Sequence, residues 1–183
     1  ISPIMPFMTW ANGLTALRLL AAPLCAWGTT TGQWRLALAL FTLAVLTDLL
    51  DGMAARRFGQ ATPGGGFFDH ATDCIFVTAT LAGLAAAGWA PWLLVVLIPA
   101  AFVQYTLDSG VLAGHALRTN VLGKTNGIGY FVLPGTVIGR QAFGLEWLPP
   151  LLIDVLAWAL VATTLASMGE RLLFLIRIRR APD

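Results

Sequence analysis

Apolar stretches long enough to cross a membrane follow one another along this chain, and they constrain its fold more than any other feature. A helix that crosses the hydrocarbon layer of a bilayer, about 30 Å thick, needs about 20 mostly apolar residues. Turn-forming residues separate the stretches, as in Thr62-Pro63-Gly64 and between Gly88 and Pro91. We therefore predict six membrane-spanning helices, over residues 12–31, 34–57, 65–88, 91–117, 121–139 and 148–178.

The composition agrees with a chain that is largely covered by lipid. Of its 183 residues, 57% are hydrophobic and only 11% are charged, whereas about 25% of the residues of a soluble domain are charged. The net charge of +2 is too small to indicate a nucleic-acid partner. No repeat or compositional break divides the sequence, so we expect an all-α integral membrane bundle that forms a single domain over residues 1–183.

The basic residues predict how the bundle lies in the membrane. With six spans, both termini lie on one side, and most basic residues fall on or near that side: Arg18, Arg56, Arg57, Arg118, Lys124, Arg171, Arg177, Arg179 and Arg180. Arg35 and Arg140 fall on the other side. Because basic segments stay in the cytoplasm, we expect a multi-pass protein of the inner, cytoplasmic membrane with both termini in the cytoplasm.

Four aspartates in one short region point to a function. Asp48 and Asp51 are three residues apart near the end of the second span, and Asp69 and Asp73 are four apart near the start of the third. At 3.6 residues per turn, each pair shares one helix face. Because these two spans are antiparallel, all four carboxylates can converge at the cytoplasmic end of the bundle.

A group of carboxylates within a membrane is costly unless cations neutralise it. Carboxylate oxygens suit Mg²⁺ or Mn²⁺, and four of them are enough to bridge two ions about 4 Å apart, as in enzymes of phosphoryl displacement. Helix capping is a structural alternative for Asp69. It does not suit Asp48 and Asp51, because the helix dipole disfavours negative charge near a C-terminus. The sequence thus predicts two divalent cations.

The residues around these aspartates form a longer pattern. It reads Asp48-x-x-Asp51-Gly52-x-x-Ala55-Arg56, then eight residues, then Gly65-x-x-x-Asp69-x-x-x-Asp73. The pattern resembles the signature of the CDP-alcohol phosphotransferases, and six spans resemble the plan of that family. The resemblance implies a transferase of phospholipid synthesis that moves a phosphoalcohol from a CDP-linked donor to an acceptor hydroxyl and releases CMP. It also suggests a homodimer surrounded by membrane lipids. Because the signature lies at the basic end of the bundle, we expect the active site to face the cytoplasm.

The same resemblance implies roles for individual residues. The metal ligands are Asp48, Asp51, Asp69 and Asp73, and Asp73 is also the general base. Candidates for binding the nucleotide and its diphosphate are Gly52, Ala55, Arg56, Gly65, Asn12 and Thr15. Structural alternatives are a positive-inside anchor for Arg56, a turn for Gly65 and a helix cap for Asn12 and Thr15.

Residues beside the third aspartate and on the fourth and fifth spans bear on the nature of the acceptor. His70 follows the third aspartate, as in choline and ethanolamine phosphotransferases, so we predict a second catalytic residue there. Its alternative is a hydrogen bond to a metal-bound carboxylate. The fourth span, around Gln104 to Asp108, has no cation for an acceptor phosphate. We therefore favour an uncharged hydroxyl-bearing acceptor that contacts Asp108. Gly123-Lys124 resembles the relatives that use a phosphorylated acceptor, and this resemblance favours the alternative, a phosphatidylglycerophosphate synthase.

For several charged residues the sequence is compatible with both a functional and a structural role. Arg118 and Lys124 are candidates for binding acceptor or lipid phosphate, or are positive-inside residues. Arg18 and Asp108 lie at membrane depth, so each is a site candidate, or the two form a pair. An ion or solute transporter is the alternative from another functional class. It is disfavoured because the acidic residues lie at one membrane end and not along a path.

Overall fold

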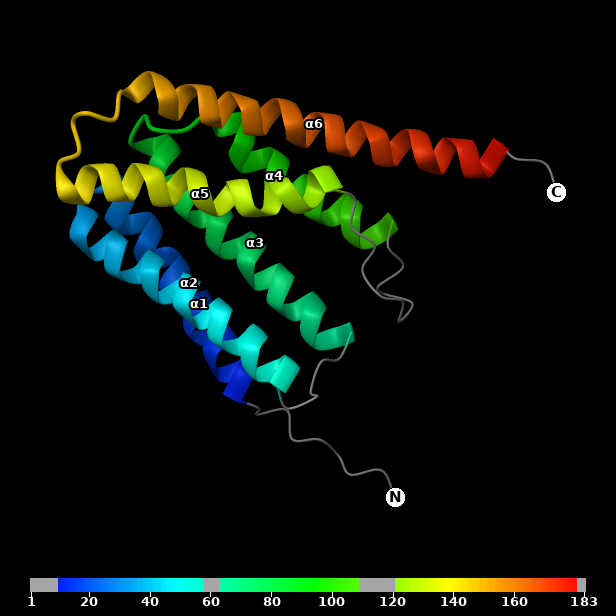
Figure 1. The fold of residues 1–183 in the computed structure, drawn as a ribbon, viewed down its shortest axis with the longest axis horizontal. Coiled ribbons are helices and arrows are strands. Elements are labelled where there is room, and N and C mark those ends of the chain that lie inside the picture. The colour runs from blue at the N-terminus through cyan, green and yellow to red at the C-terminus, as the bar shows by residue number, and fades with distance from the viewer. Residues whose placement is uncertain (1–9, 58–62, 109–120, 181–183) are drawn as a thin grey trace.

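A computed structural model describes residues 10–57, 63–108 and 121–180 of the chain (Figure 1). Within these ranges, the side chains of residues 10–12, 51–52, 54–57, 63–65, 108 and 175–180 are outside the described set. The elements are six helices: α1 Trp10–Thr30, α2 Trp34–Arg57, α3 Pro63–Ala86, α4 Trp92–Asp108, α5 Val121–Phe143 and α6 Pro150–Arg180. The described residues contain no strand. The predicted all-helical fold is confirmed, and the helix boundaries lie within about one turn of the predicted ones, except that residues 109–120 are outside the described set.

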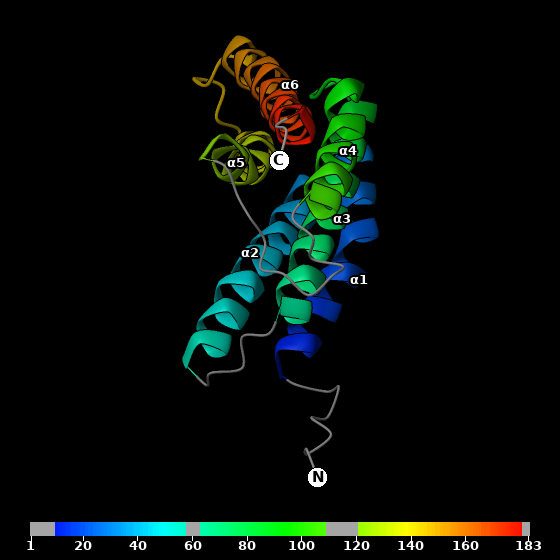
Figure 2. The same cartoon turned by 90° about the vertical axis from the view of Figure 1, so that its right-hand side faces the viewer.

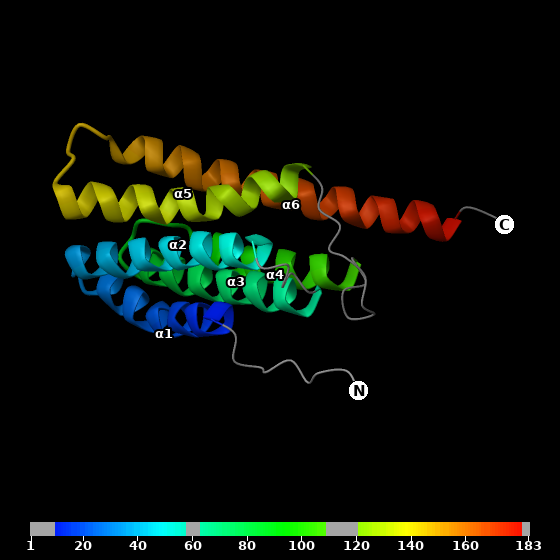
Figure 3. The same cartoon turned by 60° about the horizontal axis from the view of Figure 1, so that its bottom comes forward.

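Successive helices alternate in direction. Three short connections, after α1, after α3 and after α5, lie together at one end of the bundle (Figure 3). In each of them a glycine with positive φ follows the helix, Gly32 at 73°, Gly88 at 81° and Gly144 at 65°, a conformation that costs glycine little. The start of α3 and the ends of α2 and α6 therefore lie at the opposite end, where the sequence places the four aspartates.

Small residues hold α1 close to both of its neighbours. A Cβ atom at Gly83 of α3 would overlap the Thr29 hydroxyl and the Ala26 carbonyl of α1. A Cβ at Gly28 of α1 would lie 3.5 Å from the Cβ of Ala37 of α2, which is ordinary contact. Glycine and alanine at helix contacts allow backbones to approach closely. The C-terminal end of α1 is thereby held against the C-terminal end of α3, and α1 carries Arg18.

The remaining helices build the second half of the molecule. α5 and α6 run antiparallel to each other, α4 lies against α3 and α6, and α5 lies against α2 and α3 (Figure 2). Three aromatic rings, Phe41, Phe76 and Phe131, connect α2, α3 and α5, with centroids 5.9 to 6.5 Å apart. These ring contacts join α5 to α2 and α3.

Large apolar side chains cover much of the outer surface. Leu20, Val96 and Leu107, from α1 and α4, are 64–68% exposed. Among the described residues, one stretch, Pro150–Phe174 with mean hydropathy 1.9, is long and apolar enough by itself to cross a bilayer. Trp92–Leu107 is a shorter apolar helix. The number of spans and the side on which the helix ends lie stay predictions.

Candidate active site

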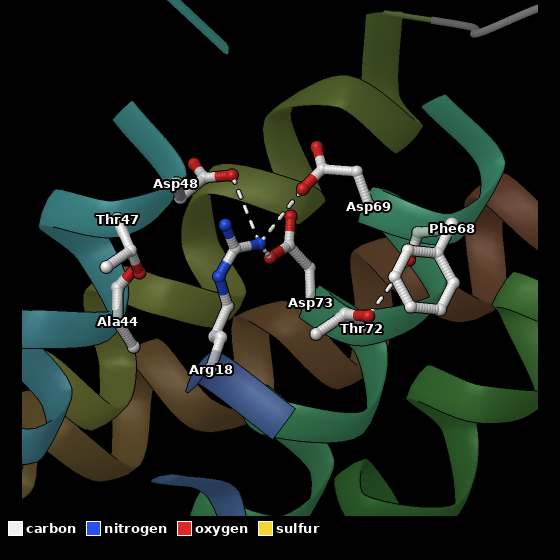
Figure 4. Close-up of polar contacts among 8 residues, drawn as sticks. All are labelled: Arg18, Ala44, Thr47, Asp48, Phe68, Asp69, Thr72 and Asp73. Atoms are coloured by element: carbon white, nitrogen blue, oxygen red, sulfur yellow. Dashed lines mark hydrogen bonds and ion pairs between the residues drawn. The ribbon is translucent and has the colours of Figure 1, made fainter. Parts of the chain in front are cut away.

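Three of the four predicted aspartates meet at one end of the bundle. One carboxylate oxygen from each of Asp48, Asp69 and Asp73 lies within 4.8 Å of the others (Figure 4). Asp69 and Asp73 are one turn apart on α3, and Asp48 reaches them from the antiparallel α2. The nearby hydroxyls of Thr47 and Thr72 donate to carbonyl oxygens of their own helices, at 2.9 and 3.0 Å. These two hydroxyls therefore donate their protons to the backbone and not to the carboxylate oxygens.

A buried guanidinium lies among these carboxylates (Figure 4). Arg18 of α1 is 1% exposed. Its Nη1 lies 3.3 Å from Oδ1 of Asp48 and 3.0 Å from Oδ1 of Asp69, and it also donates to Oδ1 of Asp73. Of the two interpretations that the sequence leaves open for Arg18, the structure supports the site candidate.

The donor set fits a divalent cation. Three hard carboxylate oxygens converge on one small space, the chemistry that Mg²⁺ and Mn²⁺ require. The position of the Arg18 cation among them indicates that this space favours positive charge. Asp51 lies one turn beyond Asp48 in α2, but its side chain is outside the described set. Its role as a fourth ligand stays a prediction.

A cavity of about 670 Å³ adjoins the carboxylates. Asp48, His70 and Asp73 lie at its polar end, and residues such as Phe41 and Ile98 form its apolar wall. Side chains of α2, α3, α4, α5 and α6 all contribute to it. A cavity that is polar at one end and apolar along its length suits an amphipathic molecule whose reacting group lies next to the aspartates.

A second polar group in this cavity was not predicted from the sequence. Arg171 of α6 lies over the ring of Tyr105 of α4, with its Cζ 4.8 Å from the ring centroid, and both line the cavity with Lys124. The Tyr105 hydroxyl is buried without a hydrogen-bond partner among the described residues. So is Oε1 of Gln104, whose Nε2 donates to the Met168 carbonyl at 2.9 Å.

The residues predicted from the sequence to bear on the acceptor are His70, Asp108, Arg118 and Lys124, and Arg171 is not among them. In the sequence Arg171 indicates only the basic side of the bundle. The signal that reveals its place is the contact between α4 and α6, which the hydropathy pattern of either helix does not contain.

The other predicted residues are placed less completely. Thr15 is buried in α1, three residues before Arg18, and is not among the described residues of the cavity wall. Asp108 is the last residue of α4, and its side chain is outside the described set. Arg118 is outside the described residues altogether. The remaining nucleotide candidates lie in helices whose side chains there are not described: Asn12, Gly52, Ala55, Arg56 and Gly65.

Known sequences identify the kind of protein that carries this arrangement. The sequence profile of the CDP-alcohol phosphatidyltransferases matches residues 8–168, which include α1 through most of α6 and all four aspartates. The chain belongs to the CDP-alcohol phosphatidyltransferase family. The resemblance inferred from the aspartate signature is thereby confirmed.

Three relatives illustrate the range of this phosphatidyltransferase family. A probable phosphatidylglycerophosphate synthase of Mycobacterium tuberculosis is 34% identical over 139 residues, which are 68% of this chain and 66% of the relative. A cardiolipin synthase (CMP-forming) of Streptomyces coelicolor is 33% identical over 129 residues, 64% of this chain and 59% of the relative. A CDP-diacylglycerol–glycerol-3-phosphate 3-phosphatidyltransferase of Bacillus subtilis is 31% identical over 135 residues, 72% of this chain and 68% of the relative. The chain spans slightly less than two thirds of the length of the mycobacterial protein.

Proposed function

We propose that this protein is a membrane phosphatidyltransferase, which transfers a phosphatidyl group from CDP-diacylglycerol to the hydroxyl of an acceptor and releases CMP. The observation that carries the proposal is the convergence of Asp48, Asp69 and Asp73 at the polar end of an apolar cavity. Family membership supports the same reaction class. Membership in a family of transferases also argues against the alternative function, an ion or solute transporter.

The proposal assigns two divalent cations, Mg²⁺ or Mn²⁺, to Asp48, Asp51, Asp69 and Asp73. When bound, the cations neutralise charge on the diphosphate oxygens of the donor. The acceptor oxygen forms a bond to the β-phosphorus, the bond from that phosphorus to the oxygen of CMP breaks, and Asp73 takes the hydroxyl proton. His70 lies one turn before Asp73 and lines the same cavity, so it either relays this proton or orients a carboxylate. Arg56, Gly52, Ala55, Gly65, Asn12 and Thr15 are the proposed residues for the nucleotide.

The surface supports a position within a bilayer. A soluble protein seldom exposes a large continuous apolar surface, whereas large apolar side chains of α1, α2, α4 and α6 face outward here. We assign six spans to the six helices of one domain, with the aspartate end and both termini in the cytoplasm. A homodimer in the inner membrane completes this proposal.

The cavity favours an acceptor that carries a phosphate. Arg171 and Lys124 supply two cations, and the unpartnered Tyr105 hydroxyl supplies a donor, near His70 and Asp73 in one cavity. Arginine and lysine are the usual ligands of a phosphate group. We therefore prefer a phosphate-bearing acceptor to the uncharged one that the fourth helix alone favours. The name of the Bacillus relative specifies glycerol 3-phosphate, and those of the mycobacterial and Streptomyces relatives specify phospholipid products, phosphatidylglycerophosphate and cardiolipin.

The test is CMP release by the purified protein from CDP-diacylglycerol with Mn²⁺ or Mg²⁺. Glycerol 3-phosphate, phosphatidylglycerol and glycerol are compared as acceptors. We expect one of the two phosphate-bearing acceptors to react at least about tenfold faster than glycerol, because the cations of the cavity bind its phosphate. Arg171→Gln raises the KM for that acceptor about tenfold, whereas Arg140→Gln, a matched loss of charge outside the cavity, leaves it unchanged. Equal rates with glycerol contradict the acceptor assignment, and no CMP release with any acceptor contradicts the proposed function.

A further inference from the structure

The guanidinium of Arg18 lies where a cation shared by the three carboxylates has to lie. Its Nη1 contacts Oδ1 of Asp48, Asp69 and Asp73, and these oxygens lie within 4.8 Å of one another. A nitrogen atom and a metal ion cannot both occupy the small space between them. If the site binds a metal as proposed, the Arg18 side chain has to withdraw when the metal enters.

The charges explain why a cation is present at all. The three carboxylate side chains are only 23–36% exposed, and without a positive charge they repel one another across a few ångströms. A partly buried charge that loses its partner is strongly destabilising. Arg18 supplies one positive charge against three negative ones, so it holds the cluster together but leaves it with a net negative charge.

The movement has to come from the side chain and not from the helix. Gly83 brings α3 into direct contact with α1 at Ala26 and Thr29, two and three turns along the helix from Arg18. This contact holds the backbone of α1 in place against α3. The long side chain of arginine, in contrast, has several rotatable bonds through which it can leave the cluster.

We propose that Arg18 is the resident counter-ion of the metal-free site, which keeps the three carboxylates together until a divalent cation replaces its guanidinium. This inference rests on the proposed metal centre. It makes Arg18 a positioning residue that competes with the metal for the same oxygens. Removing a competitor raises the affinity for the metal. If Arg18 merely oriented the carboxylates for the metal, its removal would lower that affinity.

The test measures metal binding and stability and does not depend on turnover. Protein in detergent is freed of metal with a chelator, Mn²⁺ binding is followed by the loss of the free-ion signal in electron paramagnetic resonance, and melting is recorded with and without Mn²⁺. Arg18→Gln is compared with the wild type and with Arg35→Gln, which removes an exposed charge at the other end of α2. We expect Arg18→Gln to bind Mn²⁺ at least about tenfold more tightly, because a competing positive charge is gone.

Without metal, Arg18→Gln melts at least about 5 °C below the wild type, and saturating Mn²⁺ closes most of this gap. Arg35→Gln behaves like the wild type in both measurements. Unchanged or weaker Mn²⁺ binding by Arg18→Gln overturns the inference. If that variant does not fold without metal, Arg18→Lys replaces it, and weaker Mn²⁺ binding by Arg18→Lys than by the wild type overturns the inference as well. Failure of the wild type to bind Mn²⁺ refutes instead the proposed metal centre.

Discussion

Two arginines at opposite ends of the bundle have different surroundings. At the aspartate end, Arg18 is buried and its Nη1 contacts three carboxylates. At the other end, Arg140 of α5 lies over the ring of Trp89, with its Cζ 5.2 Å from the centroid, and its Nε donates to the Leu148 carbonyl at 2.8 Å. The contacts of Arg140 tie the connection after α5 to the connection after α3.

The difference lies in the balance of charge. The partners of Arg140 are a neutral ring and a backbone carbonyl, so its contacts are complete without a further ion. Arg18 meets an excess of carboxylates, which a structural ion pair does not need and which further cations can neutralise. We conclude that the far end holds helices together, whereas the aspartate end is suited to exchanging ligands.

The largest effect is expected from the carboxylates themselves. Asp69→Asn or Asp73→Asn should lower CMP release at least about a thousandfold, because each change removes a metal ligand and the second also removes the base. Arg140→Gln should retain activity within about twofold of the wild type, because its contacts at the far end touch no part of the reaction. Size-exclusion and melting profiles check that the variants are folded. An Asp69→Asn enzyme with near-normal turnover is incompatible with the comparison.

Removal of metal should have a comparable effect on activity at the aspartate end. Dialysis against a chelator should reduce CMP release to about 1% or less, and Mn²⁺ or Mg²⁺ should restore it, since the donor diphosphate then lacks the positive charge that stabilises its reaction. The rate is measured before chelation, after it and after each metal is added back. Persistent activity in the chelated enzyme argues against a metal-dependent reaction.

A smaller effect, on stability, is expected at the close contact between α1 and α3. Gly83→Ala should destabilise the protein by about 1–3 kcal/mol, because the added Cβ overlaps Thr29 and the Ala26 carbonyl. Gly139→Ala in α5 is the matched control, since a Cβ there meets nothing within 4 Å. Denaturant or thermal unfolding in detergent measures both. Equal stabilities of the two variants would show that close contact between α1 and α3 does not determine stability.

The smallest effect is expected at the far end. Arg140→Gln should cost about 1 kcal/mol of stability, because one cation–π contact and one hydrogen bond are lost at a partly exposed position. Its Mn²⁺ affinity should equal that of the wild type. A change in metal affinity in this variant would mean that the two ends are coupled, and the contrast between them would then fail.

Much of this arrangement was predictable from the sequence, for identifiable reasons. Helix length in a bilayer and the Gly and Pro residues between apolar stretches determine the six helices. The spacing of Asp69 and Asp73, together with antiparallel neighbours, determines that they meet Asp48. What the sequence does not contain is which distant helices touch. The sequence makes Arg18 of α1 a site candidate, but its contacts with the three carboxylates are visible only in the structure. The place of Arg171 of α6 beside Tyr105 is likewise visible only there.

The central claim is that the carboxylates at the aspartate end of the bundle form a dinuclear metal centre. The most direct measurement is anomalous diffraction from crystals grown with Mn²⁺, at the manganese absorption edge. The account predicts two peaks among Asp48, Asp51, Asp69 and Asp73, with the Arg18 guanidinium moved out of the space between them. Manganese bound elsewhere, with Arg18 still contacting all three carboxylates in Mn²⁺-saturated crystals, would contradict it.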